Sequence, residues 1–160
     1  MIVLSKINPR GIIWLASYPR SGNTWTRAFV NNLIHIVEDS SFSELDINRI
    51  EPWTAAENDV EHYTKLLRKP GFRATAAEIA AARPRVQAEI ARAAGRPVYV
   101  KTHNANALDH GHPLVNTGVT AGTVYLVRNP LDVAISLVHF AGSSIDRAIE
   151  DMGTPGFGVN

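Results

Sequence analysis

A segment between a short apolar run and a helix-like stretch limits the folds open to this chain more than any other feature. Residues 17–25 read S-Y-P-R-S-G-N-T-W and directly follow the apolar run 12–16. A short apolar run of this kind is typical of a strand that is buried on both faces. Pro19 and Gly22 favour a tight turn after it, and apolar residues then recur at helical spacing. The segment therefore predicts a strand, a glycine-containing turn and the start of a helix.

The predicted turn is suited to holding an anion. The N-terminus of a helix presents unpaired backbone N–H groups and about half a positive charge. Gly22 permits a ligand to approach the backbone closely. Arg20 adds a permanent charge whose fork can bind two oxygens at once. The candidate binding residues at this turn are Arg20, Ser21, Gly22, Asn23 and Thr24.

The same turn lacks the lysine of a standard phosphate-binding loop. That motif reads G-x-x-x-x-G-K-[ST], and here Asn23 stands at the lysine position. The third predicted strand ends in Arg128 instead of the acidic residue that would help to hold magnesium. We therefore expect a site without a metal ion, for a donor that carries fewer charges than a nucleoside triphosphate.

The order of apolar runs along the chain predicts an α/β fold. Two more short runs, 98–100 and 123–127, alternate with helix-like stretches, which is typical of a parallel sheet flanked by helices on both faces. In such sheets, ligands bind beyond the carboxyl ends of the strands. Each predicted strand is followed by residues that can take part in chemistry: Arg20 to Thr24, Lys101 to His103, and Arg128. We expect these three strand ends to form one site.

The expected helices have recognisable signals. They cover about 24–36, 75–94, 130–140 and 145–152. Thr75 and Glu78 have the spacing of a capping box, and Gly95 stands where a helix C-cap belongs. The first helix carries an apolar stripe that we expect to face the core: Trp25, Phe29, Leu33 and Ile36. The acidic residues of 38–61, Glu57 among them, and the arginines of 68–96 are interpreted as solvated surface.

Composition narrows the classes of function. With 160 residues and an apolar fraction of 45%, the chain has the size and the core-forming residues of one ordinary domain. Its formal net charge of +1 is too small to favour nucleic acid or an anionic membrane as a partner. The absence of cysteine excludes disulfides, thiolate zinc sites and a cysteine nucleophile. No apolar run approaches the ~20 residues of a membrane helix, so we expect a soluble, cytoplasmic protein.

Three segments together resemble the motifs of the sulfotransferases that use 3'-phosphoadenosine 5'-phosphosulfate (PAPS). Segment 17–25 is similar to the family's 5'-phosphosulfate loop, commonly T-Y-P-K-S-G-T-T-W. Segment 98–103 is similar to the strand end with the catalytic histidine, and segment 123–136 to the 3'-phosphate motif. The resemblance implies that residues 1–160 form the N-terminal part of a sulfotransferase domain, with a P-loop NTPase-like parallel sheet flanked by helices.

The resemblance also implies a reaction, the transfer of a sulfuryl group from PAPS to a hydroxyl or amine of a small-molecule acceptor. His103 would be the general base, for which a neutral imidazole is suited. Lys101 would stabilise the sulfuryl oxygens, and Arg20, at a position where the family usually has lysine, would bind the phosphosulfate. Residues 21–25 would hold the 5' end. The remaining expected contacts are Trp25, as a surface for adenine and as a core anchor, and Arg128 and Ser136 at the 3'-phosphate.

The chain departs from the family pattern after the 3'-phosphate motif. The family continues to an R-K-G loop that closes over the 3'-phosphate, and nothing up to Asn160 matches that loop. We therefore expect the chain to be a truncated product, to associate with itself, or to receive the missing half from a partner. The alternative function is a module that binds PAPS or its desulfated product without turnover. A kinase is the weaker alternative, because Asn23 replaces the lysine.

Overall fold

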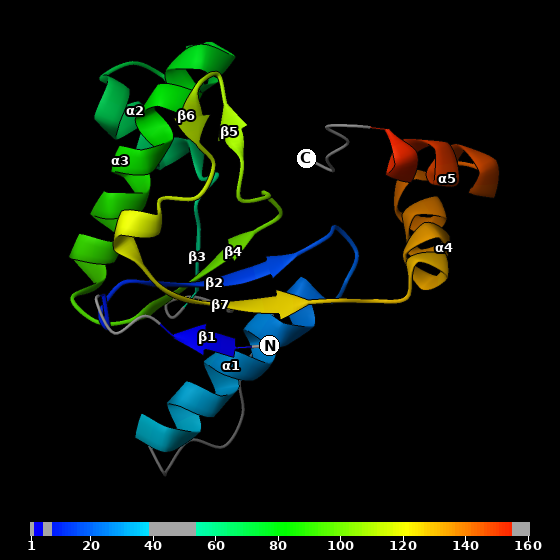
Figure 1. Cartoon of the computed structure of the whole chain (residues 1–160), viewed down its shortest axis with the longest axis horizontal. Helices are drawn as coiled ribbons and strands as arrows, with labels where there is room; N and C mark the ends of the chain where they lie inside the picture. The colour runs from blue at the N-terminus through cyan, green and yellow to red at the C-terminus, as the bar shows by residue number, and fades with distance from the viewer. Residues whose placement is uncertain (1, 5–7, 39–53, 155–160) are drawn as a thin grey trace.

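A five-stranded sheet with the order β1-β7-β2-β4-β3 forms the centre of the computed structural model, which describes residues 2–4, 8–38 and 54–154 (Figure 1). Four strands are parallel, and only β1 runs antiparallel, against β7. The predicted α/β parallel sheet is therefore confirmed. The strands are β1 (Ile2–Leu4), β2 (Ile12–Ser17), β3 (Thr54–Ala56), β4 (Val98–Thr102) and β7 (Thr120–Leu126).

The register of the central strands brings their carboxyl ends to one edge of the sheet. Ala16 near the end of β2 pairs with Thr102 on β4 and with Tyr125 on β7. The third strand was predicted over 123–127. The observed strand β7 begins earlier, at Thr120, and ends at Leu126, so Val127 lies outside it. The two edge strands β1 and β3 were not predicted, since each has only three residues.

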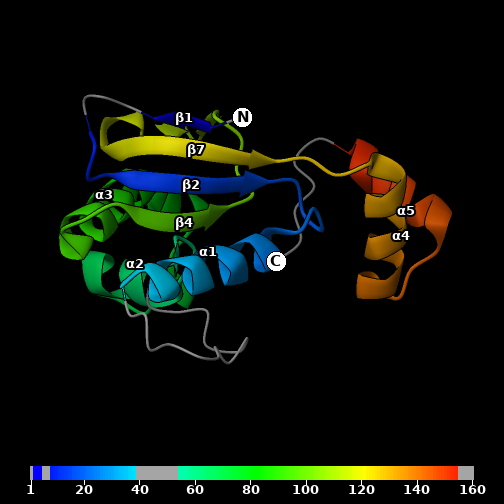
Figure 2. The same ribbon diagram turned by 90° about the horizontal axis from the view of Figure 1, so that it is seen from below.

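Helices cover both faces of the sheet, and two further helices lie beyond the end of β7 (Figures 1 and 2). Figure 1 shows α2 and α3 on one face and α1 on the other, and Figure 2 shows α4 and α5 beyond the end of β7. The core between β2, β4 and α3 contains Trp14, Val100 and Val86. The helices are α1 (Asn23–Glu38), α2 (Val60–Leu67), α3 (Ala76–Ala94), α4 (Pro130–Ala141) and α5 (Ile145–Gly153).

The predicted helix signals are confirmed where the structure describes them. Thr75 and Glu78 form a reciprocal capping box at the start of α3, and Gly95 ends the helix with φ of 62°. Pro130 occupies the first turn of α4, after the N-cap Asn129. No described helix is long and apolar enough to cross a membrane.

The apolar stripe of α1 does not face the core, so that prediction is wrong. Trp25 is 75% exposed and Phe29 66% exposed, and Leu33 and Ile36 are exposed as well. The helix instead buries Asn23, Ala28 and Asn31. Helical periodicity identifies an apolar face, but it does not say what covers that face. Nothing in the described part of the chain covers it.

Two charged residues assigned to the solvated surface are also placed differently. Glu57, directly after β3, is only 5% exposed. Arg83 on α3 forms an ion pair with Asp109 at 3.1 Å, and its side chain is 12% exposed. Asp109 belongs to a small hairpin of β5 (Leu108–Asp109) and β6 (His112–Pro113), inside a segment predicted as loop. Residues 39–53 of the acidic segment and the tail 155–160 lie outside the described residues.

Candidate functional site

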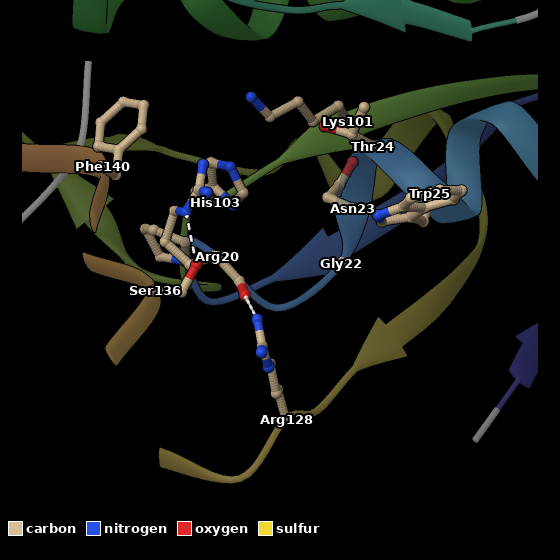
Figure 3. A pocket seen from close by; sticks show the side chains of 11 residues that line it. Arg20, Gly22, Asn23, Thr24, Trp25, Lys101, His103, Arg128, Ser136 and Phe140 are labelled. Atoms are coloured by element: carbon tan, nitrogen blue, oxygen red, sulfur yellow. Dashed lines mark hydrogen bonds between the residues drawn. The ribbon is translucent and has the colours of Figure 1, made fainter. Parts of the chain in front are cut away.

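A cleft with a volume of about 550 Å³ lies beyond the carboxyl ends of β2 and β4 (Figure 3). Its walls come from the turn after β2, the end of β4, the segment after β7, and one face of α4. Segments that are distant in sequence therefore meet in it, as the strand register requires. The lining residues are Pro19, Arg20, Gly22, Asn23, Thr24, Trp25, Lys101, His103, Arg128, Ser136 and Phe140.

Nearly all of the candidate site residues from the sequence meet in this cleft. Ser21 is the exception, because it lines a second cavity of about 220 Å³ together with Tyr18 and Leu126. Phe140 lines the cleft but was not a candidate. Its position one helical turn after Ser136 was the signal that could have identified it, since residues four apart share a helix face.

The turn after β2 opens the N-terminus of α1 toward the cleft. Arg20 and Gly22 have left-handed backbone conformations, with φ of 64° and 95°. The amide of Ser21 donates to the carbonyl oxygen of Tyr18 at 3.3 Å, which closes the turn. No heavy atom lies within 4 Å of the position that a Cβ on Gly22 would take. A ligand can therefore approach the backbone at this point.

Asn23 connects the start of α1 to β2. Its side chain is buried, and Nδ2 donates to the carbonyl oxygen of Leu15 at 2.7 Å and to Oγ of Ser17 at 3.1 Å. Oδ1 is buried without a hydrogen-bond partner among the described residues. The residue at the lysine position of a phosphate loop therefore has a structural side chain, and only its backbone N–H is available to an anion.

The ring of His103 has a fixed orientation at the end of β4. Nδ1 lies 2.8 Å from the carbonyl oxygen of Ser17, and this oxygen can only accept, so Nδ1 carries the proton. Nε2 of the neutral ring is then the free basic nitrogen. His103 is exposed to the cleft, yet surrounding protein atoms displace enough water to lower its pKa below 6.5. The hydrogen bond to Ser17 opposes this shift, and the positive charge of Lys101 adds to it.

Lys101 lies beside His103, and Figure 3 shows both side chains extending from β4 toward the cleft. Partial burial lowers the pKa of the Lys101 ammonium from its ordinary value, and the charge of Arg27 lowers it further. The Lys101 side chain thus places a positive charge in the same cleft as His103, close enough to lower the pKa of the imidazole.

The two arginines of the cleft are linked to each other and to α4. Nε of Arg20 donates to Oγ of Ser136 at 3.1 Å, and its guanidinium lies 4.7 Å from the ring centre of Phe140. Nη1 of Arg128 donates to the backbone oxygen of Arg20 at 3.0 Å. Figure 3 shows both contacts. Neither arginine forms an ion pair with a carboxylate in the described part of the chain, so their charges remain available for an anion.

Comparison with known proteins gives one match. A family model described as the sulfotransferase domain matches residues 10–152, which include the sheet from β2 onward and every lining residue of the cleft. Searches of curated proteins and of solved structures gave no significant match. Within the described ranges, no group of three or more His, Asp or Glu side chains is arranged to hold a metal ion.

Proposed function

The chain belongs to the sulfotransferase domain family, and we propose that its cleft binds PAPS and transfers the sulfuryl group to a hydroxyl or amine of a small-molecule acceptor. The lining residues include two exposed aromatic side chains, Trp25 and Phe140, and no pattern that selects one acceptor class. The donor and the roles of individual residues are argued below from the contacts in the cleft.

The cleft has the donor set that a nucleotide with two anionic ends requires. Its volume of about 550 Å³ falls in the range of small-molecule sites, about 300–1,000 Å³. The open N-terminus of α1 and the guanidinium of Arg20 are suited to the 5' end. Arg128 and Ser136 are suited to the 3'-phosphate. Oγ of Ser136 accepts from Arg20, which leaves its O–H free to donate to a phosphate oxygen.

The residues beside the 5' end support sulfuryl transfer. The donor supplies an activated sulfuryl group: its S–O bond to the phosphate breaks, the electron pair stays on the phosphate oxygen, and a new bond forms to the acceptor. Nε2 of His103 takes the proton that the acceptor loses. Lys101 stabilises negative charge on the sulfuryl oxygens, and Arg20 stabilises charge on the leaving phosphate oxygen. Arg20 acts through its charge alone, since a guanidinium does not release its proton.

The contact between Nδ1 of His103 and the carbonyl oxygen of Ser17 is the observation that carries this proposal. A proton on Nδ1 leaves Nε2 basic, and the same cleft contains two arginines that have no carboxylate partner among the described residues. The test is the release of PAP, the desulfated product, from PAPS in the presence of a panel of phenols, alcohols and amines. His103→Ala should bind PAP with unchanged affinity and lose turnover by about 10²- to 10⁴-fold. His139→Ala, at an exposed position of α4, is the matched control and should retain turnover. Full turnover in His103→Ala would refute the base role.

A second candidate function is the binding of PAPS or PAP without turnover. Trp25, Arg128 and Phe140 are exposed to water. Stabilising the charge of a transition state is more effective in a site that excludes water, so this exposure favours binding without turnover. Tight binding of PAP, without sulfation of any acceptor in the same panel, would support this alternative over transfer.

A further inference from the structure

A buried carboxylate lies behind the catalytic edge of the sheet. Glu57 follows β3 directly and is 5% exposed. Its Oε1 accepts a hydrogen bond from Oγ1 of Thr102 at 2.9 Å and another from Nδ2 of Asn104 at 2.7 Å. Its Oε2 accepts from Nε2 of Gln87 on α3. Glu57 therefore joins three separate segments of the chain: α3, β4 and the loop after β4.

The partners of Glu57 are themselves held in place. Gln87 is fully buried, and Nε2 also donates to the carbonyl oxygen of Leu114 at 2.9 Å. Oε1 of Gln87 accepts from the backbone amide of Asn116 at 2.7 Å. Gln87 therefore cannot exchange its donor for its acceptor without losing these contacts.

The three donors determine which form of Glu57 fits the site. All of them offer hydrogens, so an ionised carboxylate satisfies them and an amide or acid does not. Burial raises the pKa of Glu57 above its ordinary value, and its hydrogen bonds and the nearby charge of Arg83 offset only part of this rise. Among the described residues, Tyr63 on α2 is also close enough for the charge of Glu57 to raise its pKa. A buried carboxylate is costly unless it is fully bonded, which suggests a specific use at this position.

Thr102 and Asn104 are the two chain neighbours of His103, one on each side. Oγ1 of Thr102 also accepts from the backbone amide of Asn104 at 3.0 Å, so the segment around His103 is closed into a small turn. The ring of His103 is held separately by the carbonyl oxygen of Ser17. We propose that Glu57 is a positioning residue for His103: its carboxylate fixes residues 102–104 so that the imidazole keeps its bond to Ser17 and directs Nε2 into the cleft.

A purely structural role for Glu57 makes a different prediction. Such a role would lower the stability of the chain and leave the environment of His103 unchanged. A positioning role changes the pKa and the tautomer of His103, because a released ring gains water and loses its bond to Ser17. The positive charge of Lys101 lowers the His103 pKa. Loss of the negative charge of Glu57 would lower this pKa as well, so a rise in Glu57→Gln reports on the position of the ring. The effect on turnover rests on the proposed function, but the effect on the ring does not.

The test is Glu57→Gln in the full chain, with three measurements. NMR titration should show the His103 pKa rising toward 6.5 and the Nδ1–H tautomer losing its dominance. Turnover of PAPS should fall by about 10- to 100-fold, as a small misplacement of a catalytic group predicts. The affinity for PAP should stay within about twofold of the original, because its proposed phosphate contacts lie elsewhere in the cleft.

Asn116→Ala is the matched control. It removes the bond from Nδ2 of Asn116 to the carbonyl oxygen of Pro84 and the bond from the amide of Gly118 to Oδ1, and it keeps the backbone amide that donates to Gln87. It should lower stability and leave the His103 titration unchanged. A titration that is identical in Glu57→Gln and in the original chain would overturn the proposal, whatever happens to stability.

Thr102→Val and Thr102→Ser keep the proposal testable if Glu57→Gln does not fold. Valine removes the hydroxyl that donates to Glu57, and serine retains it. The His103 pKa should rise in the valine variant alone, and an equal pKa in both variants would overturn the positioning role.

If PAPS turnover is intact in the original chain and in Glu57→Gln, the inference fails while the proposed function stands. If the original chain shows no turnover but the titration shifts as expected, the positioning role stands and the proposed function fails.

Discussion

Replacing Arg20 separates the backbone role of this position from the role of its charge. Its φ of 64° lies in the left-handed region, which costs a non-glycine residue about 1–2 kcal/mol. Glycine removes this strain but adds about 0.4–1 kcal/mol of entropy to the unfolded chain. Arg20→Gly should therefore be more stable than Arg20→Ala by about 0.5–1 kcal/mol, although alanine is usually the more stable choice. Urea unfolding of the two variants measures the difference.

The contacts of Arg20 set the comparison with the original chain. Both variants lose the exposed hydrogen bond to Ser136, worth about 0.5–1.5 kcal/mol, and the stacking on Phe140, worth about 0.5–1 kcal/mol. Arg20→Ala should lose about 1–2.5 kcal/mol in total. Relief of strain should restore part of that loss in Arg20→Gly. An alanine variant as stable as the glycine variant would refute the strain argument.

Binding of PAP tests the charge of Arg20 independently of stability. Loss of a hydrogen bond to a charged group costs about 1.5–3 kcal/mol, so both variants should bind PAP about 10- to 150-fold more weakly. Arg20→Lys keeps the charge and should lose less. Arg10→Ala, an exposed arginine at the opposite end of β2, is the control and should bind PAP normally. Calorimetric titration measures the original chain and the four variants, and unchanged affinity in Arg20→Gly would remove Arg20 from the anion site.

The remaining predictions concern pH, Trp25 and Asn23. The pKa of His103 in the folded chain lies below 6.5, so the ring stays neutral down to a lower pH than an ordinary histidine. The midpoint of the acid limb of kcat/KM should therefore lie below pH 6.5, and a midpoint above that value would contradict the assignment. Trp25 is 75% exposed, so Trp25→Ala should change the free energy of unfolding by less than about 0.5 kcal/mol while removing a fluorescence response to PAP. A large loss of stability would restore its role as a core anchor. Asn23→Ala leaves the buried carbonyl of Leu15 without its donor and should cost about 1–3 kcal/mol in urea unfolding, and no loss would mean that this bond is dispensable.

The local parts of the fold could be predicted from the sequence because their signals are local. The apolar run 12–16 and the turn residues Pro19 and Gly22 predict a strand and a turn with no knowledge of the rest of the chain. The capping box of Thr75 and Glu78 depends on residues three apart. The meeting of the strand ends in one cleft followed from parallel topology, in which all carboxyl ends point the same way.

The features that could not be predicted depend on long-range contacts. In the sequence, nothing distinguishes Glu57 from the other acidic residues of 38–61. Its buried position depends on hydrogen bonds with Gln87, Thr102 and Asn104, which are 30 to 47 positions away. The exposed stripe of α1 shows the same limit, because a pattern of apolar residues does not determine what packs against it. The roles of Arg128 and the other cleft residues in binding remain predictions.

Binding of PAP in the presence of EDTA tests the central claim, that one cleft holds both phosphate ends of the nucleotide. We expect calorimetric titration of the full chain to show binding without magnesium, and Arg128→Ala to weaken it by about tenfold or more. Adenosine 5'-phosphate, which lacks the 3'-phosphate, should bind the two chains with equal affinity. Absence of PAP binding to the original chain, or equal PAP affinity in Arg128→Ala, would contradict the account.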